Sequence, residues 1–268
     1  MSISHWFALA AIALYLAAAG GLARRVLGSG SAHGSGPWLV LAGIGALAHL
    51  GLHFSAIAQQ GLPDLHFFSA LSVVALGMAV LSLAAALLER LDALGVLVFP
   101  VAAACVAAYA FGSHPGGDGQ TMAWPIQLHA WLALLAYAAL ALAALFACGL
   151  WLQESALRQR RITGLVRMLP PLTQTEALLF RTLRASFLLL TLALAIGLLF
   201  IDNLFAQHLA HKTVLSLLSW MVLGTLLFGH WRWGWRGARA ARWTLAAMVL
   251  LGLAFFGSRF VYEFMLGA

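Results

Sequence analysis

Long apolar runs alternate with short polar segments along the whole chain. Eight runs are long enough to cross a lipid bilayer: residues 5–23, 37–57, 67–88, 93–112, 127–152, 185–205, 211–230 and 242–264. A helix of about 20 residues spans a hydrocarbon core of ~30 Å. Helices are expected because lipid cannot satisfy exposed backbone N–H and C=O groups. The pattern predicts an all-α, polytopic transmembrane bundle of about eight spans, in which residues 1–268 form a single integral membrane domain.

Basic residues gather in alternate connections between these spans. Arginines occur in residues 24–36, 153–184 and 231–241, whereas residues 58–66 and 113–126 contain none. Because basic loops tend to stay in the cytoplasm, both termini are expected outside. The pattern predicts a multi-pass protein of a bacterial inner (cytoplasmic) membrane, with residues 153–184 as its largest cytoplasmic loop.

That loop contains its own helix signal. Pro170 and Pro171 interrupt it, and Thr173 stands three positions before Glu176, the spacing of a capping box. The sequence therefore predicts a helix that opens near Thr173 and continues into the sixth span.

Composition narrows the possible functions. The chain is 63% hydrophobic and 9% charged, and its net charge of +7 comes from arginines in short loops. The bilayer is therefore the expected partner, and no nucleic acid is expected. Cys105 and Cys148 fall inside expected spans, where small buried apolar side chains are a better interpretation than a disulfide. No nucleophile with its base, no carboxylate pair and no nucleotide-binding loop stands out, so no enzymatic activity is predicted.

Histidines gather in the outer half of the expected bundle. Six of the ten fall there: His49, His53, His66, His129, His208 and His211. His230 lies instead at the expected cytoplasmic end of its span. Ionisable groups within a membrane are costly and mark candidate functional sites.

Neutral imidazole binds metals and serves as an axial ligand of haem. Two axial ligands must approach the iron from opposite faces, so His49 and His53, one turn apart on one helix, cannot both bind one haem. The candidate metal ligands are therefore His129 with His211, or one of these with His49 of the second span. Lys212 is placed to pair with a haem propionate or with Asp202.

Other interpretations of the histidines remain open. His49 and His53, with Asp64 or His66, have the ligand types for a tetrahedral zinc site. Each histidine can alternatively hydrogen-bond between helices and hold the bundle together. His53 and His230 complete the candidate cofactor-binding set: His129, His211, His49, His53, His230 and Lys212.

Tryptophans cluster at the inner end of the last two spans, at positions 231, 233, 235 and 243. Such a cluster is typical of an interfacial aromatic belt. The alternative is an aromatic platform for a planar ligand.

Three stretches of the chain carry a family resemblance. Residues 127–154 begin QLHAWLALL, residues 167–200 begin RMLPPLTQTEALLF, and residues 211–263 contain Trp220 in mid-span and the sequence GWRG. This order resembles the cytochrome c assembly membrane protein family, in the branch typified by HemX and YpjD, over residues 37–265 and most strongly over 127–263. The resemblance implies a haem-handling protein in which His129 takes an outer-face haem-ligand position.

Three functions follow. The first is binding or transport of haem near the outer leaflet through histidines. The second is a non-catalytic accessory or regulatory subunit, with a protein partner on residues 153–184. It is favoured because residues 207–213 contain no tryptophan, where haem-presenting members of the family carry a Trp-rich segment. The third is a small-molecule permease, for which the sequence shows neither repeats nor broken helices.

Overall fold

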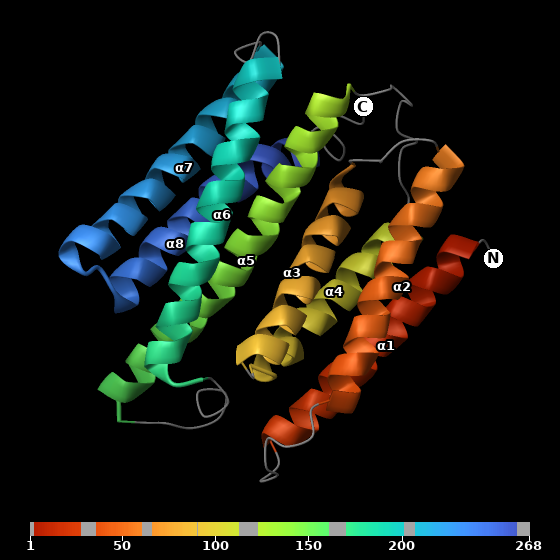
Figure 1. The fold of residues 1–268 in the computed structure, drawn as a ribbon, viewed down its shortest axis with the longest axis horizontal. Helices are drawn as coiled ribbons and strands as arrows, with labels where there is room; N and C mark the ends of the chain where they lie inside the picture. Colours follow the sequence, from red (N-terminus) through yellow and green to blue (C-terminus); the bar gives the residue numbers. More distant parts are fainter. Residues whose placement is uncertain are drawn as a thin grey trace. The chain divides into compact units, whose positions relative to one another are not determined.

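A computed structural model describes residues 3–27, 36–60, 66–89, 91–112, 123–160, 170–200 and 207–261 (Figure 1). Eight helices in the described residues are long and apolar enough to cross a membrane, which confirms the expected all-α, eight-span bundle. The elements are α1 (Ile3–Leu27), α2 (Gly36–Gln60), α3 (Phe67–Glu89), α4 (Ala93–Phe111), α5 (Trp124–Arg158), α6 (Leu172–Phe200), α7 (Gln207–Trp233), α8 (Gly237–Gly252), the π-helical segment η2 (Leu253–Gly257) and α9 (Ser258–Phe260).

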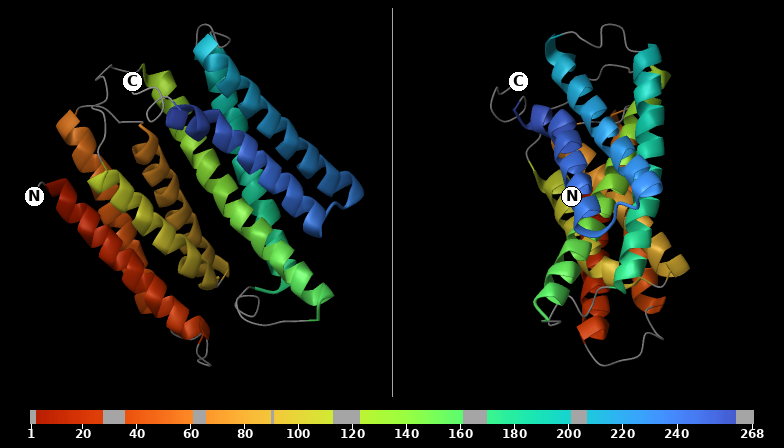
Figure 2. Two further views of the ribbon diagram at one scale, coloured as in Figure 1. Left: turned by 180° about the vertical axis from the view of Figure 1, so that it is seen from behind. Right: turned by 90° about the vertical axis from the view of Figure 1, so that its left-hand side faces the viewer.

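The helices group into two compact units. The N-terminal unit is Met1–Thr121 and the C-terminal unit is Met122–Ala268. In the first, α1 packs against α2 and α4, and α3 packs against the same two helices. In the second, α5 packs against α6 and α8, and α7 packs against α6 and α8. Each unit is thus a four-helix bundle in which every helix contacts its two neighbours around a ring (Figure 2).

Small residues allow the helices of the N-terminal unit to approach closely. Ala8, Ala11 and Ala18 of α1 are completely buried. Gly21 lies directly beneath the indole ring of Trp38, and a Cβ atom at this position would collide with that ring. The close approach of α1 and α2 therefore depends on residues with little or no side chain.

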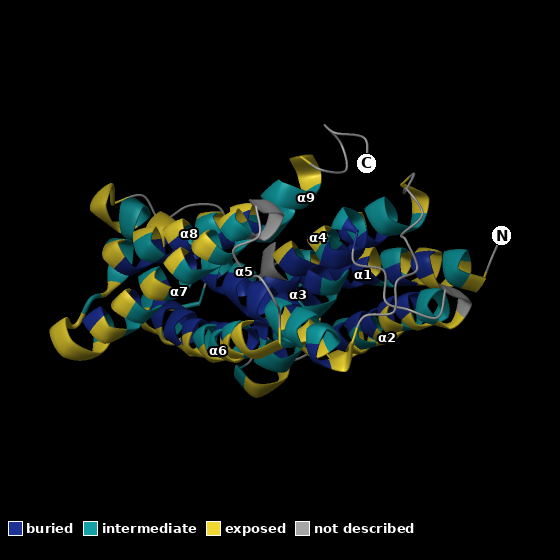
Figure 3. Ribbon diagram, turned by 90° about the horizontal axis from the view of Figure 1, so that it is seen from above, coloured by how far each residue is buried: buried dark blue, intermediate teal, exposed yellow. Residues whose placement is uncertain are grey.

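Serine hydroxyls join the helices of the C-terminal unit. Ser186 of α6 donates to the Ala136 carbonyl of α5 at 3.0 Å, and Ser219 of α7 donates to the Ala247 carbonyl of α8 at 2.9 Å. Exposed residues lie on the outward faces of α6 and α7 (Figure 3). Many of them are large and apolar, such as Leu188 and Met221, as expected of surfaces that face lipid.

Helices occupy most of the segment 153–184 that was expected to be a loop. Helix α5 continues to Arg158, and α6 begins at Leu172, immediately after Pro171, and runs without a break to Phe200. The predicted helix start near Thr173 is confirmed. The predicted capping box is not used, because the Glu176 side chain bonds to Arg236 instead of the first turn of its own helix. The cytoplasmic location of this segment remains a prediction.

The eighth span changes from α-helix to π-helix at η2, and Tyr137 of α5 explains why. Its buried hydroxyl donates to the Leu251 carbonyl. In a regular α-helix the Phe255 N–H would donate to the Leu251 carbonyl four residues earlier. The tyrosine hydroxyl binds the acceptor of that bond, and such an insertion is a recognised cause of a local change in helix geometry.

Candidate functional site

Three helices of the N-terminal unit bring a polar cluster together around Ser72. The Ser72 hydroxyl of α3 lies 2.8 Å from His49 Nε2 and 3.1 Å from His53 Nε2, both on α2. Tyr15 of α1 lies 3.4 Å from His49 Nδ1 through its hydroxyl oxygen. Ser72 has one proton, so it can donate to only one imidazole, and at least one histidine must donate its own Nε2 proton.

Aromatic stacking extends this cluster toward the start of α3. The His49 and His53 rings lie 5.4 Å apart, and the His53 ring stacks on Tyr109 of α4 at 4.9 Å. Tyr109 also contacts His66 at 5.6 Å. Three histidines that the sequence placed in the outer half therefore meet inside one unit, and all three are buried.

The cluster does not have the arrangement of a zinc site. Among the described residues, no three His, Cys, Asp or Glu side chains are positioned to hold a metal ion. Asp64, a candidate fourth ligand, lies outside the described residues. Both ring nitrogens of His49 are engaged, so the contacts shown here are those of a buried hydrogen-bond network.

His129 is held by a single well-defined bond in the C-terminal unit. Its Nδ1 lies 2.7 Å from the Ala193 carbonyl oxygen of α6. A carbonyl can only accept, so Nδ1 carries the proton, and Nε2 of the neutral ring carries the lone pair. This bond fixes the tautomer and the orientation of the ring, as the partner of a metal-bound histidine does.

His211 and Lys212 lie in the first described turns of α7. His211 is exposed, Lys212 is half-buried, and Lys212 experiences the positive charge of Arg259. The alternating helix directions place the start of α5, the end of α6, the start of α7 and the end of the eighth span at one end of the C-terminal unit (Figures 1 and 2). His129 and His211 therefore share an end of this unit. His208 has no described side chain, and Asp202 lies outside the described residues.

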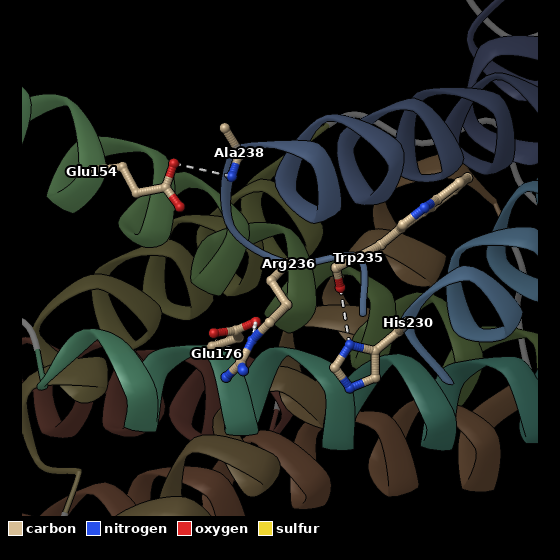
Figure 4. A network of polar contacts seen from close by, with 6 residues as sticks. All are labelled: Glu154, Glu176, His230, Trp235, Arg236 and Ala238. Atoms are coloured by element: carbon tan, nitrogen blue, oxygen red, sulfur yellow. Dashed lines mark hydrogen bonds and ion pairs between the residues drawn. The ribbon is translucent and has the colours of Figure 1, made fainter. Parts of the chain in front are cut away.

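His230 stabilises the α7–α8 hinge, residues 234–236, at the opposite end of the unit (Figure 4). Its Nδ1–H donates to the Trp235 carbonyl at 2.9 Å. Its ring stacks on Phe180 of α6, with 3.5 Å between the ring centroids. These contacts indicate that His230 fixes the hinge against α6.

Two carboxylates complete the hinge network. Arg236 Nε donates to Glu176 Oε1 at 2.7 Å, and the Ala238 N–H donates to Glu154 Oε2 at 3.1 Å (Figure 4). The hydrogen bond to Glu176, and then its negative charge, raise the pKa of Arg236. Glu154 fills the space beside Gly237, where a Cβ atom would collide with its carboxylate.

Sequence reasoning missed Glu154 altogether, and it assigned Glu176 to a capping box rather than to Arg236. Their partners lie 60 and 84 positions away along the chain, so no local pattern links them. The available signal was composition: Glu154 and Glu176 are two of only eight acidic residues and stand within Arg-rich segments.

The sequence profile of the Cytochrome C assembly protein family matches residues 38–266. The chain belongs to this family. The match covers most of both units and confirms the resemblance drawn from the stretches around His129, Pro170 and Trp220.

Curated relatives within the family include inner membrane proteins. The chain is 39% identical over 136 residues to Inner membrane protein YpjD of Escherichia coli (strain K12), covering 51% of each protein. It is 41% identical over 144 residues to an uncharacterized 28.8 kDa protein of Azospirillum brasilense, covering 53% of each. It is 29% identical over 131 residues to Protein HemX of Brevibacillus brevis, covering 48% of each.

The chain spans about half the length of the curated relatives it matches. No solved structure matches it. Family membership and the eight spans establish a multi-pass membrane protein of the cytochrome c assembly family.

Proposed function

We propose that this chain is a haem-handling protein of the bacterial inner membrane, which binds haem near the outer leaflet through His129. The observation that carries the proposal is the 2.7 Å bond between His129 Nδ1 and the Ala193 carbonyl. It leaves the Nε2 lone pair as the coordinating atom, which is the tautomer that an axial haem ligand requires.

His211 is the second ligand that fits this proposal best. It lies on a different helix from His129, at the same end of the C-terminal unit, and is exposed. Lys212, the next residue, supplies a positive charge for a haem propionate. When bound, haem would supply a redox-active iron, and the protein residues would hold and orient it.

The other candidate histidines fit packing roles better. His49 would have to give up Tyr15 or Ser72 to coordinate iron, and His53 shares the same serine. His230 stacks on Phe180 at the hinge. The proposal therefore assigns ligation to the C-terminal unit.

The test is haem titration of the purified protein in detergent. The unaltered chain should retain a Soret band, and His129→Ala should lose it. Added imidazole should restore the band in His129→Ala, which separates loss of a ligand from loss of the fold. His5→Ala serves as the histidine control and should behave like the unaltered chain. Retention of an unchanged band by His129→Ala would refute the proposal.

A non-catalytic accessory function is the second candidate. Helix α5 has 35 residues, so its length is about 52 Å, which exceeds a hydrocarbon core of ~30 Å. Its last turns expose Leu157 and Arg158 within the segment 153–184. A protein partner on this segment is the corresponding proposal. Crosslinking from a cysteine at position 158 should capture one defined partner, and recovery of the chain alone would count against it.

A further inference from the structure

Arginine outnumbers carboxylate at the hinge end of the C-terminal unit, where α5 and α7 end and α6 and α8 begin. The described acidic residues of this unit are only Glu154 and Glu176. The described arginines at this end number eight: Arg158, Arg160, Arg181, Arg184, Arg232, Arg236, Arg239 and Arg242. The described arginines at this end therefore outnumber the described carboxylates of the unit by six.

Both carboxylates already form bonds at the hinge and at the start of α8. Glu176 pairs with Arg236, and Glu154 accepts the Ala238 N–H. Arg239 instead lies over the Trp235 ring, 5.3 Å from its centroid, and Arg242 donates to the Ala238 carbonyl of its own helix at 3.3 Å. Neither of these contacts neutralises a guanidinium charge.

A continuous aromatic array runs beside these arginines. Phe228 contacts Trp231 at 5.9 Å and Trp233 at 5.4 Å, and Trp233 stacks on Trp235 at 5.7 Å. Trp231 is 78% exposed and Trp233 is 59% exposed. Indole side chains favour the headgroup level of a bilayer, where one side is apolar and the other is wet.

We propose that the hinge surface, formed by Trp231, Arg232, Trp233, Arg239 and Arg242, binds the phosphate of an anionic phospholipid. The indoles hold the hinge at the headgroup level, and guanidinium groups bind phosphate through paired, charge-assisted hydrogen bonds. Clustered basic side chains beside a transmembrane helix are the known chemistry for anionic headgroups. A lipid is favoured over a soluble acidic partner because the array presents apolar rings and cations together.

The test compares thermal unfolding of the full chain in nanodiscs of phosphatidylcholine alone and with added phosphatidylglycerol. Phosphatidylglycerol should raise the Tm of the unaltered chain by several degrees. The shift should disappear in Arg232→Gln/Arg239→Gln and persist in Arg24→Gln/Arg25→Gln, which removes the same charge from the other unit. Equal loss in both variants, no shift in the unaltered chain, or the same shift from inorganic phosphate would overturn the proposal.

A second measurement does not depend on the variants folding. Native mass spectrometry of the unaltered chain, taken from mixed-lipid nanodiscs, should show phosphatidylglycerol bound after phosphatidylcholine has dissociated. Dissociation of both lipids at the same collision energy would also overturn the proposal.

Discussion

His129 and His230 make the same kind of hydrogen bond at opposite ends of one bundle. Each donates its Nδ1–H to a backbone carbonyl, Ala193 for one and Trp235 for the other. The first bond joins α5 to α6, and the second joins the end of α7 to the hinge, between residues only five positions apart. The stacking of His230 on Phe180 explains why the two imidazoles, although similarly oriented, are assigned different functions.

Replacement of Ser72 tests the buried histidine cluster. Ser72→Ala removes the hydroxyl that both His49 and His53 contact, and leaves buried imidazole nitrogens without that partner. The free energy of unfolding should fall by about 1–3 kcal/mol. Reversible unfolding in mixed micelles measures this change.

Ser55→Ala is the matched control. The Ser55 hydroxyl donates to the Leu52 carbonyl within α2 itself, so its loss should cost much less. Equal destabilisation by the two substitutions would show that the shared contact with the imidazoles has no special energetic value.

Among the connections between helices, the α7–α8 hinge depends on two glycines with different surroundings. Gly234 has φ of 65° and open space around its Cα, whereas Gly237 has φ of 59° and the Glu154 carboxylate beside it. Positive φ costs an L-residue about 1–2 kcal/mol. Gly234→Ala should lose about that much stability, and Gly237→Ala should lose more.

Stability measurements on single and double variants separate the cost of a positive φ from the cost of the collision between a new Cβ atom and the Glu154 carboxylate. Adding Glu154→Ala should reduce the penalty of Gly237→Ala, because it removes the colliding carboxylate. The penalty of Gly234→Ala should not change. If Gly237→Ala and Glu154→Ala together lost as much stability as the sum of their separate losses, the close contact between Gly237 and the Glu154 carboxylate would be contradicted.

The π-helical segment leads to a prediction for α8. Tyr137→Phe removes the hydroxyl that donates to the Leu251 carbonyl, which the Phe255 N–H would use in a regular α-helix. The regular bond can then close, and the residues beyond Leu251 should rotate by about 100°, the angle of one helical residue.

Cysteine scanning across Leu253–Gly257 detects this rotation of the residues beyond Leu251. The positions most reactive toward a lipid-soluble thiol reagent should shift by one residue in Tyr137→Phe. Tyr15→Phe, a similarly buried tyrosine in the other unit, should leave the pattern unchanged. An unshifted pattern in Tyr137→Phe would show that another feature produces the π-helix.

The sequence predicts the helices well but predicts the contacts between them poorly. Span lengths follow from hydrophobicity alone, and Pro170 and Pro171 marked the start of α6 because proline favours helix starts. The π-helix was not predictable, since it depends on a tyrosine more than a hundred positions away. The sequence placed His49, His53 and His66 in the same half of the bundle, so their convergence was predictable. Ser72 was not, because nothing in the sequence distinguishes it from other serines within spans.

At the scale of the whole molecule, the division into two units was hidden from the sequence. Every span is apolar, and hydropathy does not tell which helices pack together. The ring of contacts in each unit depends on small-residue faces and on pairs such as Ser186 with Ala136, which lie 50 positions apart. That residues 1–268 form a single integral membrane domain stays a prediction.

Orientation in the membrane is the whole-molecule prediction. Arginines of the hinge and of the segment 153–184 should face the cytoplasm, and both termini should face outside. With Cys105 and Cys148 replaced by alanine, single cysteines at His5 and Gly112 should react with an impermeant maleimide in intact spheroplasts. Cysteines at Arg160 and Arg236 should react only after lysis. The reverse labelling pattern would invert the topology and place His129 on the cytoplasmic side.

Tyrosine and phenylalanine differ by a single oxygen atom, and at position 137 that atom donates to the Leu251 carbonyl where the eighth span turns from α-helix to π-helix. A point substitution at that position would displace the side chains after Leu251 as the insertion of one residue into a regular helix does, with no change in chain length.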